Sequence, residues 1–217
     1  MNTHLYCFLA LLPLTLVTFA GEAPKAACCA EEKPVVPACC AVLENADTAA
    51  AGFSARSLYQ LDAAWTDDQS HAVTLASLRG QPVVVAMFFS SCTYACPMLV
   101  NDMQRIRAAL PTAAAARAKF LLVSFDTARD TPAALRAFRE RSAIDAGWTL
   151  LRGDEDAVQE LAMLLGVKFK LEPSGQFSHS NLITVLNPAG EIAYQRPGLM
   201  GDVSEATQAV VTAAQLP

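Results

Sequence analysis

A run of seven apolar residues at positions 83–89, VVVAMFF, constrains the fold more than any other segment of the chain. An apolar run without polar alternation is typical of a central strand that is covered on both faces. The apolar side chains that recur at helical spacing after this run are Leu99, Met103, Ile106 and Leu110. A buried strand that leads directly into an amphipathic helix indicates an α/β domain.

The alternation of strand and helix continues along the chain. Further strands are expected at residues 120–125, 148–151, 182–186 and 191–194. Two apolar segments, 58–61 and 73–75, flank a polar stretch at 67–70, which predicts a hairpin at the start of the domain. Thr131 stands before a proline and therefore has the form of a helix N-cap.

The later helices also have boundary signals. Asp154 is expected to cap a helix that Gly166 ends, and Asp202 with Glu205 resembles a capping box that opens the last helix. Strand–helix alternation implies parallel pairing, whereas a terminal hairpin adds antiparallel strands. We therefore expect an α/β fold with a thioredoxin-like mixed sheet, helices on both faces and an N-terminal hairpin.

The first 56 residues differ in composition from the rest. Residues 1–20 contain an uncharged apolar run with a small-residue ending, which predicts a secretory signal peptide or a short membrane anchor. Residues 21–56 are rich in Ala and Pro and predict a flexible tether, and residues 57–217 are expected to form the domain. The expected location is the periplasm or another extracytoplasmic compartment, with an inner-membrane anchor as the alternative.

Four of the seven cysteines form two adjacent pairs in the predicted tether. The pairs are Cys28-Cys29 and Cys39-Cys40. Their spacing differs from that of a CxxC…CxxC zinc site. Copper or zinc binding, disulfide pairing and thiol exchange all stay open for these residues.

The charge of the chain excludes one class of partner. The formal net charge is −5, and no block rich in Lys and Arg is present. Proteins that bind nucleic acid through its phosphates carry a basic patch, so we expect no nucleic-acid partner.

The strongest candidate site lies where the strand at 83–89 turns into a helix. Pro97 is expected to be the first helical residue, with Cys96 as the N-cap and Cys92 in the loop before it. A helix N-terminus favours anions, so a stabilised thiolate is expected at Cys96. The two thiols can close a disulfide, or they can converge on a soft metal ion with His179 as a third ligand.

His179 lies 83 residues after Cys96, in a polar loop at 176–181 that is expected to enter a strand. In a thioredoxin-like layout this loop faces the helix that bears the cysteines. The arrangement therefore predicts either metal handling or thiol redox chemistry.

Three segments resemble the Sco/SenC family. Residues 88–97, FFSSCTYACP, resemble its CxxxCP motif, and residues 124–132, SFDTARDTP, are similar to its DPxxDTP segment. Residues 177–180, FSHS, match its histidine loop. The resemblance extends from about residue 57 to residue 201, and Thr127 stands where the family usually has proline.

The resemblance implies an exported thioredoxin-like domain that binds copper, as Cu(I) and also Cu(II), through Cys92, Cys96 and His179. Asp126 matches the family's aspartate, for which we expect an orienting or electrostatic role. Family members help to assemble the binuclear copper centre of cytochrome c oxidase. The partners implied are the copper-acceptor subunit of that oxidase or of a similar copper enzyme, and exported thiol reductants.

Several functions stay open at the level of sequence. The leading hypothesis is a copper chaperone, and the alternative on the same residues is a thiol-disulfide reductase acting on cysteines of the copper acceptor. A third is a copper store built on the tether cysteines. Thr93 and Cys96 also give the TxxC pattern of thiol peroxidases, but Phe89 stands where such enzymes require proline.

Overall fold

The computed structural model describes residues 52–216. The predicted signal segment, most of the predicted tether and the four tether cysteines lie outside the described residues, so the hypotheses on them stay predictions. Within residues 52–216, none of the helices is both long and apolar enough to cross a bilayer.

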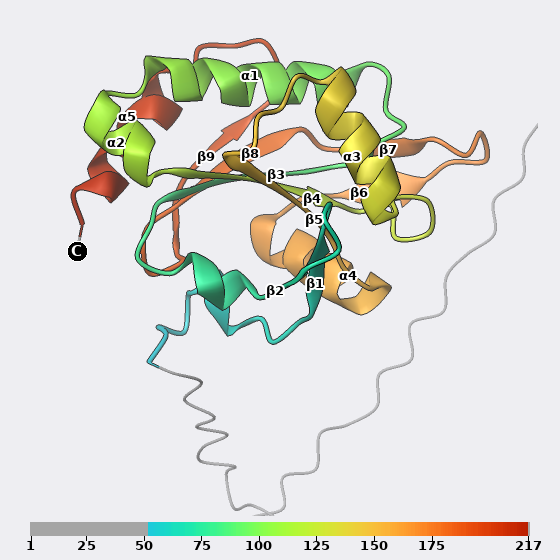
Figure 1. The fold of residues 1–217 in the computed structure, drawn as a ribbon, viewed down its shortest axis with the longest axis horizontal. Coiled ribbons are helices and arrows are strands. Elements are labelled where there is room, and N and C mark those ends of the chain that lie inside the picture. Colours follow the sequence, from blue (N-terminus) through green and yellow to red (C-terminus); the bar gives the residue numbers. More distant parts are fainter. Residues whose placement is uncertain (1–51, 217) are drawn as a thin grey trace, which may run out of the picture. The chain divides into compact units, whose positions relative to one another are not determined.

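A seven-stranded mixed sheet forms the centre of the domain (Figure 1). The strand order is β2-β1-β5-β4-β3-β8-β9. Strand β4 pairs in parallel with both β3 and β5, whereas β8, β9, β1 and β2 add antiparallel pairs at the two sides. The strands are β1 (Trp65–Asp67), β2 (Ala72–Val73), β3 (Val83–Phe88), β4 (Lys119–Ser124), β5 (Trp148–Arg152), β8 (Leu182–Leu186) and β9 (Ile192–Pro197).

Helices cover both faces of this sheet (Figure 1). Helices α1 and α3 lie on one face, and α4 lies on the other. The helices are α1 (Ala95–Ala109), α2 (Thr112–Arg117), α3 (Pro132–Arg141), α4 (Glu155–Leu165) and α5 (Ser204–Ala214), with two 3-10 helices, η2 (Leu58–Gln60) and η3 (Leu75–Leu78). The mixed sheet between two helical layers confirms the predicted thioredoxin-like fold.

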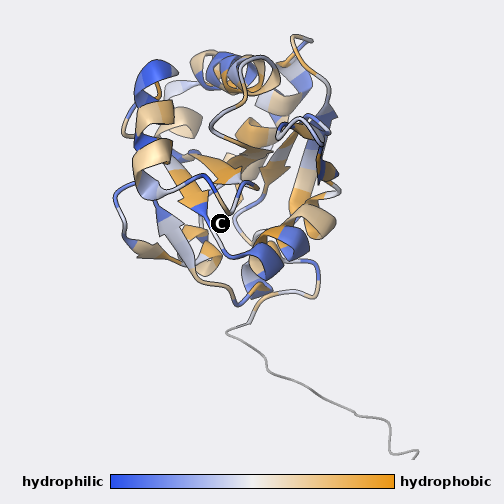
Figure 2. Cartoon of the chain, turned by 90° about the vertical axis from the view of Figure 1, so that its right-hand side faces the viewer, coloured by the Kyte–Doolittle hydropathy of each residue, from blue (hydrophilic) through white to orange (hydrophobic). Residues whose placement is uncertain are grey.

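The core is built around β3, whose six residues are all buried. Figure 2 shows the apolar strands gathered inside the helices. Helix α1 packs its apolar face on them, and Leu99, Met103 and Ile106 have no exposed surface. Burial of each such side chain contributes about 1.5–3 kcal/mol, so this contact fixes α1, and with it Cys96, on the sheet.

The predicted helix caps at Thr131 and Asp154 are confirmed. Thr131 Oγ1 accepts a hydrogen bond from the Ala134 N–H at 3.2 Å, and Asp154 Oδ1 accepts one from the Ala157 N–H at 2.8 Å. Each cap contributes about 1 kcal/mol. Gly166 ends α4 with φ of 73°, the left-handed conformation that glycine adopts without steric cost.

The prediction of a strand at residues 58–61 is wrong, because most of this segment forms the 3-10 helix η2. Ser57 Oγ accepts a hydrogen bond from the Tyr59 N–H at 3.2 Å, and this cap favours a helical turn over an extended chain. The N-terminal hairpin does exist, but β1 and β2 form it.

The predicted capping box at Asp202 is also wrong. Val203 is the N-cap residue of α5 and makes no side-chain cap. Asp202 Oδ1 instead accepts from the Ser204 N–H at 3.0 Å, so the carboxylate closes the turn before the helix.

Two elements have no counterpart in the sequence prediction. The alanine-rich helix α2 is short and lacks a polar N-cap, because Pro111 occupies that position. Strands β6 (Phe169–Leu171) and β7 (Phe177–His179) form a separate two-stranded sheet. The sequence predicts a loop at residues 176–181, but Phe177–His179 form β7. A three-residue strand with mixed polarity carries no periodic signal.

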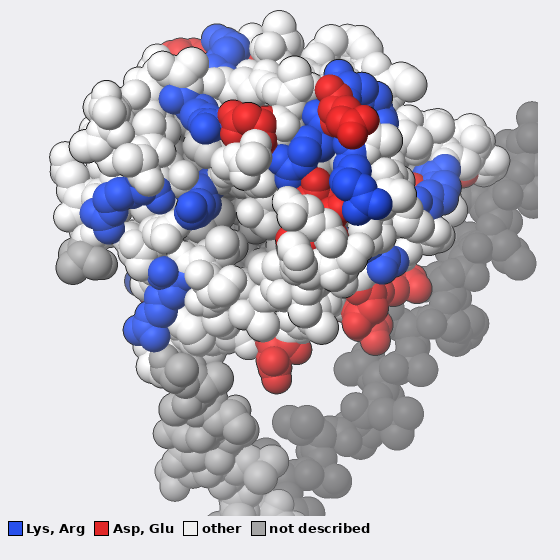
Figure 3. Space-filling view, in the orientation of Figure 1, with Lys and Arg blue, Asp and Glu red and all other residues white. Residues whose placement is uncertain are grey.

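Charged side chains of both signs are interspersed on the face seen in Figure 3. One largely buried pair joins Arg139 on α3 to Asp68 in the β1–β2 turn, with Nε and Oδ2 2.6 Å apart. This pair fixes the N-terminal hairpin against the layer that carries α3.

Candidate metal centre

Both cysteines lie at the junction of β3 and α1, as predicted. The helix begins at Ala95 with Tyr94 as its N-cap residue, so the prediction of Cys96 as the N-cap is wrong. Pro97 therefore occupies the third helical position, which proline tolerates because N–H groups of the first turn have no intrahelical acceptor. Cys96 consequently lies inside the first turn, with no exposed surface.

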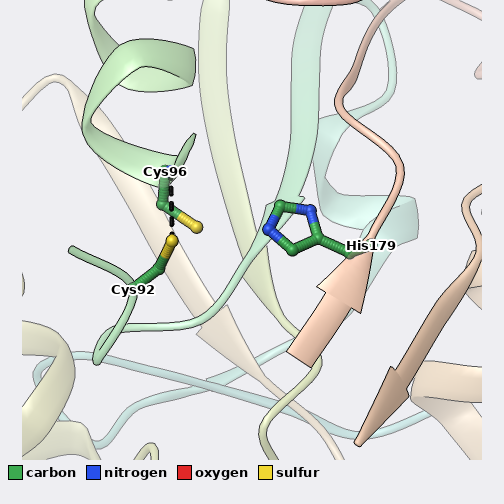
Figure 4. Close-up of side chains that lie close together, drawn as sticks. All are labelled: Cys92, Cys96 and His179. Carbon is green, nitrogen blue, oxygen red and sulfur yellow. Dashed lines mark hydrogen bonds between the residues drawn. The ribbon is translucent and has the colours of Figure 1, made fainter. Parts of the chain in front are cut away.

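His179 is the last residue of β7, and its ring points at the two sulfur atoms (Figure 4). The thiol sulfurs of Cys92 and Cys96 and a ring nitrogen of His179 all lie within 4.8 Å of one another. Residues 83 positions apart in the sequence thus meet at one point, as the sequence predicts. Within the described part of the chain, this is the cluster of three ligand-type side chains that can hold a metal ion.

The backbone sets the tautomer of His179. Its Nδ1 lies 3.1 Å from the carbonyl oxygen of Ser180, which can only accept a hydrogen bond, so Nδ1 carries the proton. The other ring nitrogen, Nε2, faces the sulfurs (Figure 4). The ring held in this way directs Nε2 at the cysteines and is placed to act as a ligand.

The two thiols differ in protonation. The hydrogen bond from the Cys96 thiol, helped by the backbone N–H groups of Cys96 and Tyr94, holds the pKa of Cys92 well below its ordinary value, against the opposing effect of burial. The hydrogen bond to Cys92, together with burial, raises the pKa of Cys96. The expected thiolate is therefore on Cys92, which is partly exposed, and the prediction of a stabilised thiolate at Cys96 is wrong.

This reversal has a geometric cause. The Cys96 N–H, one of the free donors of the first helical turn, points at the Cys92 sulfur at 3.4 Å. The helix N-terminus does stabilise a thiolate, but it stabilises the one in the preceding loop, because Cys96 itself is inside the helix and shielded from water.

Aromatic rings form the wall behind the imidazole. The ring centroid of His179 lies 5.7 Å from that of Phe89 and 5.3 Å from that of Phe125. Phe177, two positions before His179 in β7, packs on the same two rings at 5.3 and 5.2 Å. These contacts attach the hairpin formed by β6 and β7 to the ends of β3 and β4.

Asp130 anchors the loop that leads to the cysteines. This carboxylate is buried and accepts hydrogen bonds from the Ser90 N–H at 2.8 Å and from the hydroxyls of Ser90 and Ser124, each at 2.5 Å. Arg141 on α3 donates to the Ser90 carbonyl. Sequence reasoning missed Asp130 as a site residue, although it lies four positions after Asp126 in the segment that resembles the family motif.

Asp126, predicted to orient or tune the site, is buried at the end of β4. Its carboxylate accepts from the Arg129 backbone N–H at 3.1 Å and pairs with the Arg129 guanidinium. Its side-chain hydrogen bonds are thus to Arg129 and not to the cysteines or the histidine. Its predicted orienting or electrostatic role stays a prediction.

A model of the family described as SCO1/SenC matches residues 55–215. The chain belongs to the SCO1/SenC family. It is 28% identical over 141 residues to a protein of Stutzerimonas stutzeri named "Putative copper-binding protein", with 63% of this chain and 67% of that relative covered.

Solved structures of family members share the fold. The structure of Bradyrhizobium japonicum ScoI with copper bound aligns with a TM-score of 0.57 at 23% identity, covering 70% of this chain and 96% of that one. Yeast Sco1 with copper bound aligns with a TM-score of 0.58 at 21% identity, covering 69% and 84%. At this level of identity the likeness shows a common thioredoxin-like architecture.

The donor set of this SCO1/SenC domain fits one soft metal ion. Two ligands at about 2.3 Å from the same ion lie no more than about 4.6 Å apart, and the three donor atoms here already lie within 4.8 Å. Two thiolates and an imidazole select soft ions over hard ones such as Mg²⁺. A small inward movement of one side chain would complete the coordination.

Proposed function

We propose that this chain is an exported copper chaperone that binds copper through Cys92, Cys96 and His179. The observation that carries the proposal is the convergence of two thiols and one imidazole within 4.8 Å. Family membership and a relative named for copper binding support the choice of copper over other soft ions. Its acceptor would be the copper centre of cytochrome c oxidase or of a similar copper enzyme.

Copper is the cargo in this proposal, and the site has features that suit transfer. Cu(I) prefers thiolates, whereas Cu(II) would recruit further oxygen or nitrogen ligands. Cys96 is buried, and Cys92 is partly exposed. A thiolate of the acceptor would therefore first replace Cys92 at the metal, while Cys96 and His179 still hold the ion.

The location proposed is outside the cytoplasm. It rests on the apolar run within residues 1–20, and cell fractionation of the full chain tests it. An extracytoplasmic site would also place the two thiols where exported reductants must keep them reduced before copper can bind.

The thiols support a second function, the reduction of a disulfide in the copper acceptor. The lowered pKa of Cys92 and its partial exposure favour attack, with Cys96 beneath it as the resolving thiol. The Cys92 thiolate would attack one sulfur of the acceptor disulfide, and the other sulfur would leave as a thiolate. Cys96 would then lose its proton and attack the Cys92 sulfur, which breaks the mixed disulfide and releases the acceptor's first sulfur as a thiolate. The acceptor thereby gains two electrons, and a Cys92–Cys96 disulfide forms.

Copper stoichiometry of the reduced full chain tests the first function. We expect one tightly bound Cu(I) per chain in a variant with Cys28, Cys29, Cys39 and Cys40 replaced by serine. Loss of that copper in this variant would assign binding to the tether cysteines and contradict the proposal. A second copper in the unaltered chain that disappears in the variant would support an additional tether site.

Mixed-disulfide trapping tests the second function. In a Cys96→Ser variant, an acceptor peptide with a disulfide should stay covalently bound to Cys92, because the resolving thiol is absent. The matched Cys92→Ser variant should trap nothing. Equal trapping by both variants would contradict the assignment of Cys92 as the attacking residue.

A further inference from the structure

The hairpin that carries His179 is not hydrogen-bonded into the seven-stranded sheet. Its strands β6 and β7 pair with each other, with Phe169 opposite His179 at one end and Leu171 opposite Phe177 at the other. The distance from His179 to the thiols therefore depends on how this hairpin is held against the rest of the domain.

Packing alone holds the hairpin incompletely. A groove of about 470 Å³ lies between the hairpin, α4 and the segment that follows β4. Its walls include Phe125, Thr127, Val158, Lys170 and Gly175. Side chains do not fill this space, so polar contacts at the tip of the hairpin add to the aromatic packing in holding it.

Arg129 makes such a contact. Its guanidinium donates through Nη1 to the carbonyl oxygen of Gly175 in the hairpin turn at 2.6 Å. The same guanidinium lies over the ring of Phe177, 5.5 Å from the ring centroid. Arg129 thus contacts both the turn and the strand that ends at His179.

Asp126 fixes Arg129 in this position. The carboxylate is 2% exposed and accepts from both the backbone and the guanidinium of Arg129. A planar guanidinium with a buried carboxylate on one side and a carbonyl on the other keeps a defined orientation. The pair therefore links the end of β4 to the tip of the hairpin.

We propose that Arg129, oriented by Asp126, is a positioning residue that sets His179 against Cys92 and Cys96. The copper-affinity part of this inference rests on the proposed function, whereas the positional part concerns the metal-free protein. Asp130, the residue after Arg129, anchors the cysteine loop through Ser90. One short segment after β4 thus holds both halves of the site in register.

The test uses Arg129→Met in the full chain with the tether cysteines replaced by serine. Because this change leaves a buried carboxylate without its cation, a second variant, Asp126→Asn with Arg129→Met, removes both charges. Arg105→Met is the matched control, since Arg105 also pairs with a buried aspartate three positions earlier, Asp102, and donates to a loop carbonyl, that of Gly201.

Hydrogen exchange of the metal-free reduced protein is the first measurement. The Glu172 N–H, which donates to the Gln176 carbonyl across the hairpin turn, should exchange at least tenfold faster in both Arg129 variants. The Phe125 N–H, which donates to the Phe88 carbonyl in the main sheet, should be unaffected. Unchanged exchange of the Glu172 N–H in both variants would overturn the inference.

Copper affinity with and without His179 is the second measurement. Both Arg129 variants should bind Cu(I) about tenfold to a hundredfold more weakly, and adding His179→Ala to them should bring the total loss only to that of His179→Ala alone. Arg105→Met should keep the affinity, and its effect should add to that of His179→Ala. Additive losses in the Arg129 variants would overturn the positioning role. If the unaltered chain binds no copper, the proposed function fails, and the hydrogen exchange still decides the positional part.

Discussion

The two halves of the candidate metal centre are built in different ways. The cysteine loop continues a fully buried central strand, and Asp130 and Arg141 bind the backbone of Ser90 from two sides. The histidine is at the end of a two-stranded hairpin that packs through aromatic rings and is attached at its tip by Arg129. The cysteine half is therefore fixed by the core, whereas the hairpin that carries His179 can move.

This difference suits a site that must both hold and release an ion. A rigid dithiol keeps the two strongest ligands in place, and a hairpin with few buried contacts opens at low cost in free energy. Movement of the hairpin would withdraw the imidazole without disturbing the fold. The predictions below test this division between the two halves.

The largest effect is expected from removal of either thiol. Cys92→Ala or Cys96→Ala should abolish tight Cu(I) binding in the chain that lacks the tether cysteines, because one thiolate and one imidazole make a weak site for a soft ion. Competition with a Cu(I) chelator measures this. Retention of near-normal affinity by either variant would contradict a site with both thiols as ligands.

Asp130→Ala should damage the fixed half of the site and the whole fold. Three donors, the Ser90 N–H and two hydroxyls, lose their acceptor, at about 1 kcal/mol or more each. We expect the free energy of unfolding to fall by about 3 kcal/mol in denaturant titration. Asp145→Ala, at an exposed carboxylate paired with Arg107, is the control and should cost less than about 1 kcal/mol.

His179→Ala, unlike Asp130→Ala, should weaken copper binding while leaving the stability of the fold nearly unchanged. Its side chain is partly exposed on the hairpin, so the free energy of unfolding should change by less than about 0.5 kcal/mol. Copper affinity should fall about a hundredfold, which corresponds to about 2.8 kcal/mol at 1.4 kcal/mol per tenfold. An unchanged affinity would remove the hairpin from the metal centre.

A smaller effect concerns alkylation of the reduced, metal-free protein. The pKa of Cys92 is lowered, so its thiolate persists as the pH falls below 8, where an ordinary thiol is protonated. At pH 6 Cys92 should react with iodoacetamide at least about tenfold faster than a free cysteine. Mass spectrometry should find Cys96 unmodified at that pH, and preferential labelling of Cys96 would reverse the assignment.

Most of the cysteine half of the site could be predicted from the sequence, but little of the hairpin that holds His179. The apolar run that forms β3 and the helical spacing of Leu99, Met103 and Ile106 predicted the strand, the helix and the junction that bears the cysteines. The assignment of the thiolate failed because it depended on where the helix begins, and helix ends vary by one or two residues. That shift of two positions moved Cys96 from the cap into the helix.

The hairpin could not be predicted in the same way. Its strands have three residues each, and Phe177, Ser178 and His179 show no extended apolar run. The role of Arg129 could not be predicted either, since an arginine a few positions from an aspartate is common in protein sequences. Its meaning depends on Gly175, 46 positions later, whose carbonyl lies beside the guanidinium only in the folded chain.

The most direct test of a three-ligand site built from these two halves is X-ray absorption of the Cu(I)-loaded chain that lacks the tether cysteines. The account predicts one copper with two sulfur neighbours and one imidazole nitrogen, and loss of the nitrogen signal in His179→Ala. A copper site with sulfur neighbours alone, the same in both proteins, would contradict it.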